Sequence, residues 1–396
     1  MSPDGRGRLS DMESRTTTDR FAPVQAALQR QVDEGRVPGF VAAVRYAGRA
    51  EVLTGGRPHL DADAPMRAGT QFRLASVSKP FAGALTLSLV EHGALGLDDP
   101  VDRWLPELAD ARVLSAPGAD LTDTRPVDEP ITVRHLLTST AGFGGLWDDS
   151  PLAVAMDERG LSPGPFPPTV PPDEYLRRLG GLPLAARPGE RWLYHTSTDV
   201  LSVLLARATG RPLPDLLAER VTGPLQLHGT GFTADPARLA TQYAPTDDGL
   251  ALLDPPGGRF ARPPAFAGLA AGLVSTAPDV LAFLCALADG GSPVLGPSSV
   301  ALMTTDALAP EQRAPAQDFL GPGISWGLQV GVTVEADGEG RRPWATPGRW
   351  GWDGGTGTSA WVDPAHGLVG VLLTQRLMGG PDDGPDAFWA AVHDCL

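Results

Sequence analysis

The chain has 396 residues, of which 42% are hydrophobic, and it carries a formal net charge of −15. The apolar fraction suffices for a large core, whereas the acidic balance argues against a nucleic-acid or anionic-membrane partner. The sequence shows neither a long apolar run nor the apolar stretch of a signal peptide. It therefore predicts a cytoplasmic protein that does not span a membrane.

The amino-terminal part predicts a helix followed by a hairpin. Polar residues 1–20 are expected to be disordered. Residues 21–37 repeat apolar side chains at three- and four-residue steps, which is typical of an amphipathic helix. The β-prone stretches 39–46 and 49–53 flank Gly48, a pattern that favours a hairpin.

The middle of the chain carries mainly helical signals. A helix is expected from Ser76 to about Val90, with Pro80 tolerated because it falls in the first turn. Helical patterns and proline-rich loops continue from about 95 to 320, and the loosest stretch is 161–172. Strand signals return at 324–330, 358–362 and 368–374, and a terminal helix is expected over 385–395.

This order of elements predicts one domain over 21–396. Strands at both ends of a chain with helices between them favour one sheet assembled from both termini. Its α/β part should comprise about 21–75 and 322–396, and a mainly helical part about 76–321. We therefore expect an α/β (α+β) fold, in which an antiparallel sheet with flanking helices packs against an all-helical region.

The basic residues are distributed unusually. Lys79 is the single lysine, and the other 31 of the 32 basic residues are arginine. Arginine keeps its proton in any protein, whereas a buried lysine can release it and act as a base. Ser76 lies three positions earlier, so a helix would place its hydroxyl and the amine on one face.

A Ser-x-x-Lys pair is a weak motif by itself, because a helix capped by Ser76 with a solvated Lys79 has the same pattern. A lysine near a helix amino terminus opposes the helix dipole, however. The same position suits an amine that must lose its proton, and a serine whose backbone N–H faces a developing oxyanion.

Two later segments supply further candidate groups for the site, namely the phenol of a tyrosine and a glycine-rich stretch at the edge of a strand. Tyr194 precedes a predicted helix, where it is either a packed tyrosine or a proton-transfer group. Residues 351–357 contain four glycines and lead into a strand. This pattern indicates a bulge, a turn, or backbone that a ligand approaches closely.

Together these segments resemble the serine β-lactamase and penicillin-binding-protein superfamily, in its class C β-lactamase-related branch that includes family VIII carboxylesterases and acyltransferases. The resemblance runs from about residue 21 to the end of the chain. It implies a β-lactamase/transpeptidase-like fold. It also implies that Ser76 is acylated, that Lys79 deprotonates it, and that Tyr194 relays a proton to the leaving group.

The departures from the family pattern narrow the implied substrate. The family's Lys-Thr-Gly stands here as Trp352-Asp-Gly354. Gly355 follows, and its N–H would complete an oxyanion hole with that of Ser76. Thr196 replaces the asparagine of the Tyr-x-Asn motif. The resemblance then favours an ester with a neutral or apolar acyl group over a β-lactam.

Three further residues are candidates for substrate contact. His195 either orients the substrate or packs as a structural histidine, and the segment from Phe143 to Trp147 is either a pocket-lining loop or a core anchor. No His-Glu-x-x-His or Cys-x-x-Cys motif occurs, and the Gly-x-Ser-x-Gly pattern at 323–327 falls on a predicted strand instead of the strand-to-helix turn of a nucleophile elbow. We therefore expect no metal, no cofactor and no α/β-hydrolase site.

The sequence thus predicts a serine hydrolase or acyltransferase that acts through a Ser76 acyl-enzyme on a small-molecule ester or thioester. Three alternatives stay open: an acyltransferase that passes the acyl group to an alcohol or amine, a weak β-lactamase or D-aminoacyl peptidase, and a homologue that binds ligands without catalysis. No motif indicates an oligomeric state.

Overall fold

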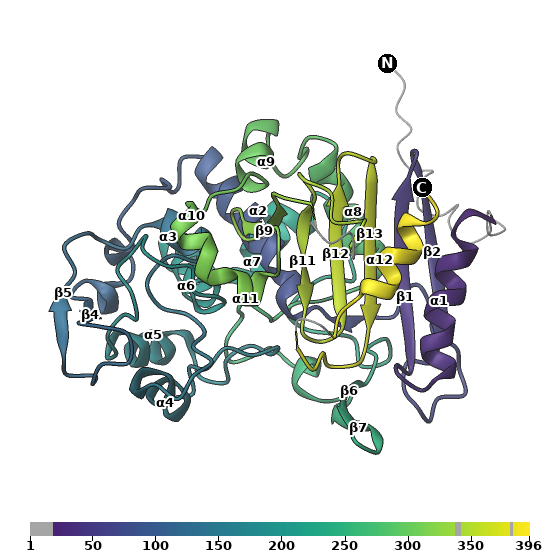
Figure 1. Ribbon diagram of the computed structural model, residues 1–396, viewed down its shortest axis with the longest axis horizontal. Helices are drawn as coiled ribbons and strands as arrows, with labels where there is room; N and C mark the ends of the chain where they lie inside the picture. Colours follow the sequence, from purple (N-terminus) through teal and green to yellow (C-terminus); the bar gives the residue numbers. More distant parts are fainter. Residues whose placement is uncertain (1–18, 337–341, 381–382) are drawn as a thin grey trace.

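The computed structural model describes residues 19–336, 342–380 and 383–396 (Figure 1). Of the segment 1–20 that the sequence predicts to be disordered, all but Asp19 and Arg20 lie outside the described residues. The helices are α1 (Ala22–Asp33), α2 (Lys79–Glu91), α3 (Val133–Leu137), α4 (Pro151–Glu158), α5 (Pro172–Gly180), α6 (Thr196–Thr209), α7 (Leu213–Leu217), α8 (Ala277–Ala288), α9 (Pro297–Met303), α10 (Pro310–Arg313), α11 (Gln317–Leu320) and α12 (Asp386–His393). The strands are β1 (Gly39–Tyr46), β2 (Arg49–Gly56), β3 (Phe72–Arg73), β4 (Arg112–Leu114), β5 (Thr124–Pro126), β6 (Gln242–Thr246), β7 (Gly249–Asp254), β8 (Val274–Ser275), β9 (Ile324–Trp326), β10 (Gly331–Thr333), β11 (Trp350–Gly354), β12 (Thr358–Asp363) and β13 (Leu368–Thr374).

A seven-stranded antiparallel sheet joins the two ends of the chain. Its order is β2-β1-β13-β12-β11-β10-β9, so the amino-terminal hairpin pairs with the last strand. The predicted α/β (α+β) class with an antiparallel sheet built from both termini is therefore confirmed. The strand predicted over 324–330 is wrong beyond Trp326, because Gly327 donates to Val330 O at 2.8 Å and closes a turn between β9 and β10.

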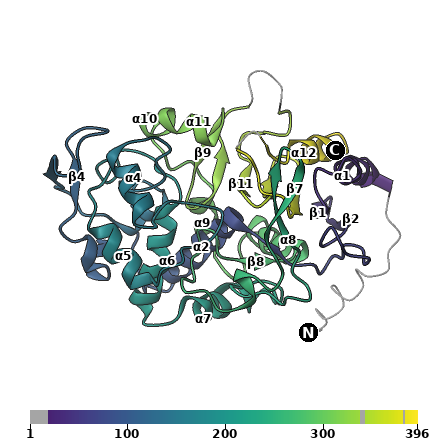
Figure 2. The ribbon, with the colours of Figure 1, turned by 90° about the horizontal axis from the view of Figure 1, so that it is seen from below.

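The two faces of the sheet bury different sets of side chains. Along β1, Phe40, Ala42 and Val44 face a core shared with α1 and α12, whereas Val41 and Ala43 face the larger core that includes α8. This alternation follows from the two-residue period of a strand. The paired helices α1 and α12 cover one face, and α8 covers the other (Figure 2).

Two buried helices occupy the mainly helical region beside the sheet. All of α2 from Lys79 to Leu89 is buried, and so are the first ten residues of α6. A helix that is apolar around its circumference belongs inside a core. α2 contacts β11, and Tyr194, two residues before α6, accepts a hydrogen bond from Trp352 of β11, so both helix starts and one sheet strand meet at one place.

Three two-stranded sheets in the middle of the chain were not predicted. They pair β3 with β8, β4 with β5 and β6 with β7, and their strands contain two to six residues. Such short strands carry too few alternations to be distinguished from loops by pattern. Across the described residues, no helix combines the length and the apolar character that a membrane-spanning segment requires.

A buried ion pair anchors the strand that leads to Ser76. The Arg73 guanidinium, 1% exposed, donates from Nε to Asp254 Oδ2 at 2.8 Å and from Nη1 to Ala240 O at 2.6 Å. Removing one partner of such a pair leaves the other charge buried without compensation. The pair therefore ties β3 to the β6–β7 hairpin directly before the serine turn.

We expect Asp254→Ala to lower the free energy of unfolding by about 3–5 kcal/mol, because it leaves a buried guanidinium unpaired. Urea denaturation followed by tryptophan fluorescence measures this loss. Asp289→Ala is the matched control, since Asp289 pairs with Arg45 at the surface and its side chain is 62% exposed. Asp289→Ala should lower the free energy of unfolding by less than about 1 kcal/mol. Equal losses in the two variants would contradict the anchoring role.

Candidate active site

Ser76 lies in a tight turn that precedes α2. The 3₁₀ segment Ala75–Ser78 leads into the helix, and Ala75 has a φ of +45°. A left-handed backbone is unfavourable for alanine and persists only where the surroundings impose it. Here the Thr358 hydroxyl donates to Leu74 O at 2.8 Å, and the Thr356 hydroxyl donates to Arg73 O at 2.6 Å. The hairpin between β11 and β12 thus holds the serine turn in place.

Lys79 is fully buried beside the serine. Its Nζ lies 3.0 Å from Ser76 Oγ, 2.8 Å from Ala270 O and 3.3 Å from His195 Nδ1. Burial lowers the pKa of Lys79 well below the usual range of lysine, and the carboxylate of Asp199 partly offsets this shift. The site therefore holds an amine that can be neutral and within hydrogen-bond reach of the serine hydroxyl.

Tyr194 lies on the other side of the serine. Its hydroxyl hydrogen-bonds with Ser76 and accepts the indole N–H of Trp352 at 2.6 Å. Burial raises the pKa of Tyr194 above the usual range of tyrosine, so the side chain is a neutral phenol. Because the indole N–H occupies one lone pair of the oxygen, the phenolic hydrogen is left for the serine side of the site.

The backbone of β11 comes close to the serine turn at its carboxyl end. A Cβ at Gly354 would lie 2.3 Å from Leu74 O and 3.3 Å from the backbone nitrogen of Ser76, so this position has no room for a side chain. At Gly355 a Cβ would meet only Pro165 Cβ, at 3.4 Å. The peptide between these two glycines thus lies at the pocket, beside the Ser76 amide.

Ser76 opens into a cavity of about 770 Å³ with aromatic walls. Phe319 packs on Tyr194 with ring centroids 4.5 Å apart, and the 63% exposed Trp147 stacks on Phe319 at 4.8 Å. Further lining residues are Pro163, Pro165, His195, Leu320, Ile324, Arg342, Trp352, Asp353, Trp361 and Asp386. Arg342 and Asp386 form an ion pair of 3.6 Å. The surface nearest Ser76 is therefore apolar. The charged groups of the lining include the Arg342–Asp386 ion pair and the carboxyl group of Asp353.

The structure brings most of the predicted site residues together. Those at the pocket or in contact with Ser76 are Lys79, Trp147, Tyr194, His195, Trp352, Gly354 and Gly355. Phe143 is 4% exposed, belongs to the main core and does not line the pocket. Thr196 is fully buried at the start of α6 and does not line it either.

Two residues at the site were missed by sequence reasoning. Asp199 lies one helical turn after His195, and this i, i+4 spacing was the signal that could have found it. Phe319 comes from the short helix α11, where no local pattern indicates a role in a pocket.

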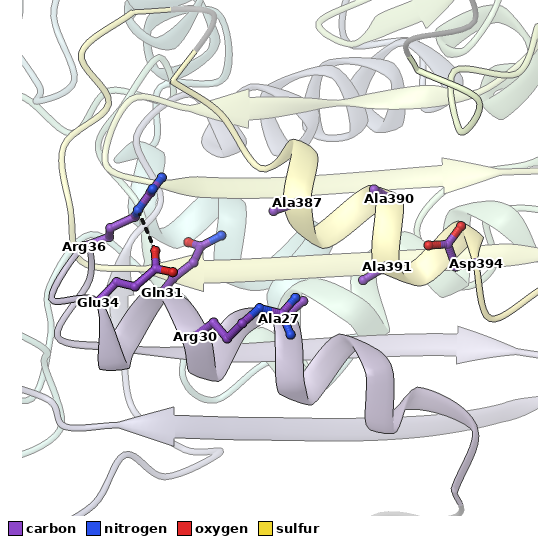
Figure 3. Close-up of a pocket in the computed structure, with 9 residues that line it drawn as sticks. All are labelled: Ala27, Arg30, Gln31, Glu34, Arg36, Ala387, Ala390, Ala391 and Asp394. Atoms are coloured by element: carbon purple, nitrogen blue, oxygen red, sulfur yellow. Dashed lines mark ion pairs between the residues drawn. The ribbon is translucent and has the colours of Figure 1, made fainter.

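A second hollow lies between the two terminal helices and does not have the properties of a reactive site. It measures about 360 Å³ and is lined by alanines of α1 and α12 and by charged side chains at its rim, among them the ion pair of Arg36 and Glu34 (Figure 3). It contains no serine, cysteine, lysine or histidine. Within the described ranges, no group of three or more His, Cys, Asp or Glu side chains is placed to hold a metal ion.

Known proteins resemble this chain in sequence and in fold. The sequence profile of the Beta-lactamase family matches residues 24–394. Esterase EstB from Burkholderia gladioli is 35% identical over 384 residues, which cover 91% of this chain and 92% of that protein. The solved structure of EstCE1, described as a hydrolase with promiscuous acyltransferase activity, has a TM-score of 0.82 at 30% identity and covers 95% of this chain and 99% of its own.

An acyltransferase shows the same fold. Simvastatin synthase (LovD) from Aspergillus terreus, in its unliganded selenomethionyl form, has a TM-score of 0.77 at 25% identity. This alignment covers 95% of this chain and 98% of that one. The family profile and these relatives together show that the chain belongs to the Beta-lactamase family and is an enzyme of its serine esterase and acyltransferase branch.

Proposed function

We propose that the chain transfers an apolar acyl group from an ester or thioester through a covalent acyl-enzyme on Ser76. Neutral Lys79 takes the hydroxyl proton while Ser76 Oγ forms a bond to the carbonyl carbon, and the carbonyl π electrons move to its oxygen. The backbone N–H groups of Ser76 and Gly355 would stabilise that oxyanion. Tyr194 then donates its proton to the leaving alkoxide as the bond to carbon breaks.

The observation that carries this proposal is the geometry around one serine: the Lys79 amine lies 3.0 Å from Ser76 Oγ, and the Tyr194 hydroxyl beside the serine is held by the indole of Trp352. Burial lowers the pKa of Lys79 and raises that of Tyr194. Divergent pKa values at one site assign the base and the acid. The lysine is therefore the base and the phenol is the acid.

The pocket supports an apolar or aromatic acyl group. Trp352 stands where a second lysine would hold a substrate carboxylate, and the chain has no second lysine. Trp352 still donates a hydrogen bond to Tyr194, so it orients the phenol without adding a positive charge. A neutral acyl group beside Trp352 and Phe319 fits these walls better than an anionic one.

Intact-protein mass spectrometry after brief exposure to p-nitrophenyl acetate or butyrate tests the proposal. The wild-type protein should gain the mass of one acyl group, and Ser76→Ala should gain none. Faster loss of the adduct with added alcohols or amines, with formation of the new ester or amide, would favour transacylation. Loss only to water would favour an esterase. Turnover of a chromogenic cephalosporin at a matching rate would favour a β-lactamase instead. If the wild type forms no adduct and releases no p-nitrophenol, the proposed acyl transfer from these esters is wrong.

A further inference from the structure

A chain of buried polar groups extends from Lys79 through His195 to Asp199. His195 Nδ1 lies 3.3 Å from Lys79 Nζ, and His195 Nε2 lies 3.6 Å from Asp199 Oδ2. Tyr175 lies near Asp199, and burial together with the charge of Asp199 raises the pKa of its phenol. His195, Asp199 and Tyr175 are each at most 3% exposed. The proposed acyl transfer uses none of these three groups directly.

The backbone at His195 is strained in a way that positions its ring. His195 has φ +81° and ψ −67°, and the N–H of Thr196 donates to Tyr194 O at 3.1 Å. This geometry is a γ-turn of the rare, strained form. Strained backbone persists where the surrounding structure imposes it, and it is concentrated at functional sites. The turn brings two consecutive side chains to the same amine: Lys79 Nζ lies 4.4 Å from the centre of the Tyr194 ring and 3.3 Å from His195 Nδ1.

The hydrogen bonds of Lys79 fix the protonation of the histidine. A neutral lysine amine has two N–H donors and one lone pair. Ala270 O and His195 Nδ1 are placed to accept from Lys79 Nζ at 2.8 Å and 3.3 Å, and the lone pair is left for the hydroxyl of Ser76 at 3.0 Å. An accepting Nδ1 requires that the imidazole proton is on Nε2, the nitrogen that faces Asp199. The Asp199 carboxylate, whose Oδ2 lies 3.6 Å from Nε2, favours this tautomer electrostatically.

We infer that Asp199 and His195 form a buried relay that stabilises the ammonium created when Lys79 takes the proton of Ser76. The inference rests on the proposed function. One proton moves, from Ser76 Oγ to Lys79 Nζ, while Oγ bonds to the carbonyl carbon. No proton leaves Asp199 or His195. The polarised imidazole ring of His195 and the carboxylate of Asp199 balance the new charge on Lys79. Both are positioning residues, since they act through Lys79 and not on the substrate.

The surroundings of the amine agree with this role. The groups that face Lys79 are the hydroxyl of Ser76, the Tyr194 ring at 4.4 Å from Nζ, His195 and the Asp199 carboxylate. Burial lowers the pKa of His195, so the ring stays neutral between the two charges. Asp199 lies in the first turn of α6, where the helix dipole favours an anion. Burial raises the pKa of the Asp199 carboxyl and the Lys79 ammonium lowers it, so the negative charge of Asp199 and the positive charge of the amine stabilise each other.

The single lysine of the chain permits a test that does not depend on activity. Protein labelled with ¹³Cε-lysine should give one lysine resonance, from Lys79, and its titration by NMR reports the pKa of that amine directly. Asp199→Asn removes the anion and leaves the ammonium without its stabiliser, so the pKa of Lys79 should fall by about one pH unit or more. His195→Asn, which keeps an acceptor for the amine but breaks the link to Asp199, should shift it in the same direction.

Kinetics provide the second readout. In Asp199→Asn, the acid limb of the kcat/KM profile should move to lower pH together with the NMR titration. The plateau should fall about 10-fold, because a weaker base removes the serine proton less effectively. KM for p-nitrophenyl butyrate should change little, since Asp199 does not line the pocket.

Asp279→Asn is the matched control. Asp279 also lies in the first turn of a buried helix, α8, and accepts the N–H of Gly229 at 2.7 Å, but it does not contact Lys79. Asp279→Asn should leave the NMR titration of Lys79 and the acid limb of the kcat/KM profile unchanged. If Asp199→Asn lowers the plateau without moving either titration, Asp199 is structural and the relay is wrong. Failure of the proposed function would give a different pattern, in which the wild type forms no acyl adduct but Asp199→Asn still shifts the NMR titration of Lys79. Formation of the adduct on the wild type therefore separates the two results.

Discussion

Lys79→Arg is expected to lower kcat/KM for p-nitrophenyl butyrate by about 10³-fold or more, even though it retains the positive charge. General-base catalysis contributes about 10²–10⁴-fold, and a guanidinium keeps its proton at any accessible pH. The amine lies 3.0 Å from Ser76 Oγ, so the substitution removes the nearest base at the nucleophile. Stopped-flow release of p-nitrophenol measures the effect, and the initial burst of acylation should disappear.

The larger guanidinium could also disturb a fully buried position, so a second variant is needed. Lys79→Met has nearly the length of lysine but no amine, and it removes the cost of burying a charge. It should lose activity to the same extent while unfolding at an equal or higher urea concentration than the wild type. A retained burst in either variant, with Ser76 still acylated, would mean that another group deprotonates the serine.

The sequence was most informative where the chemistry depends on neighbours along the chain. Ser76 and Lys79 lie one turn apart, and Tyr194 and the glycines at 354–355 stand in short segments with unusual composition. Each could be identified locally because close backbone approach and a tunable amine restrict the residue types that are allowed. The strands β12 and β13 could also be identified locally, since both are short β-prone segments and β13 is an almost continuous apolar run.

Contacts between distant segments were beyond such reasoning. The choice between core and pocket for Phe143 depends on how the loop after α3 packs, and the structure places it in the core. Phe319 reaches Tyr194 from a segment more than one hundred residues later. The break between β9 and β10 arises from one turn inside an apolar run, which a pattern of hydrophobicity cannot reveal. The fold class was accessible because it depends on the order of elements and not on any one contact.

Trp352 connects the fold to the proposed direction of proton transfer. A cation hydrogen-bonded to a phenol would lower the phenol's pKa and favour its use as a base. The indole N–H supplies the same hydrogen bond without that charge, and the pKa of Tyr194 stays above the usual range. In this site the phenol is consequently suited to give a proton, and the lysine to take one.

Tyr194→Phe should therefore have an effect that depends on the leaving group. With an alkyl ester such as ethyl butyrate, kcat/KM for acylation should fall by about 10²-fold or more, because an alkoxide needs a proton to depart. With p-nitrophenyl butyrate the loss should stay below about 10-fold, since p-nitrophenolate leaves as a stable anion. Parallel assays by pH-stat titration and by p-nitrophenol release measure the two rates.

Tyr243→Phe is the matched control for this prediction. Tyr243 is another buried tyrosine, and its hydroxyl accepts the N–H of Leu60 at 3.0 Å, away from the pocket lining. It should leave both rates within about twofold of the wild type. If Tyr194→Phe lowered both rates equally, the phenol would act before the leaving group departs, as a base or as a support for Ser76. The assignment of Lys79 as base and Tyr194 as acid would then have to be reversed or abandoned.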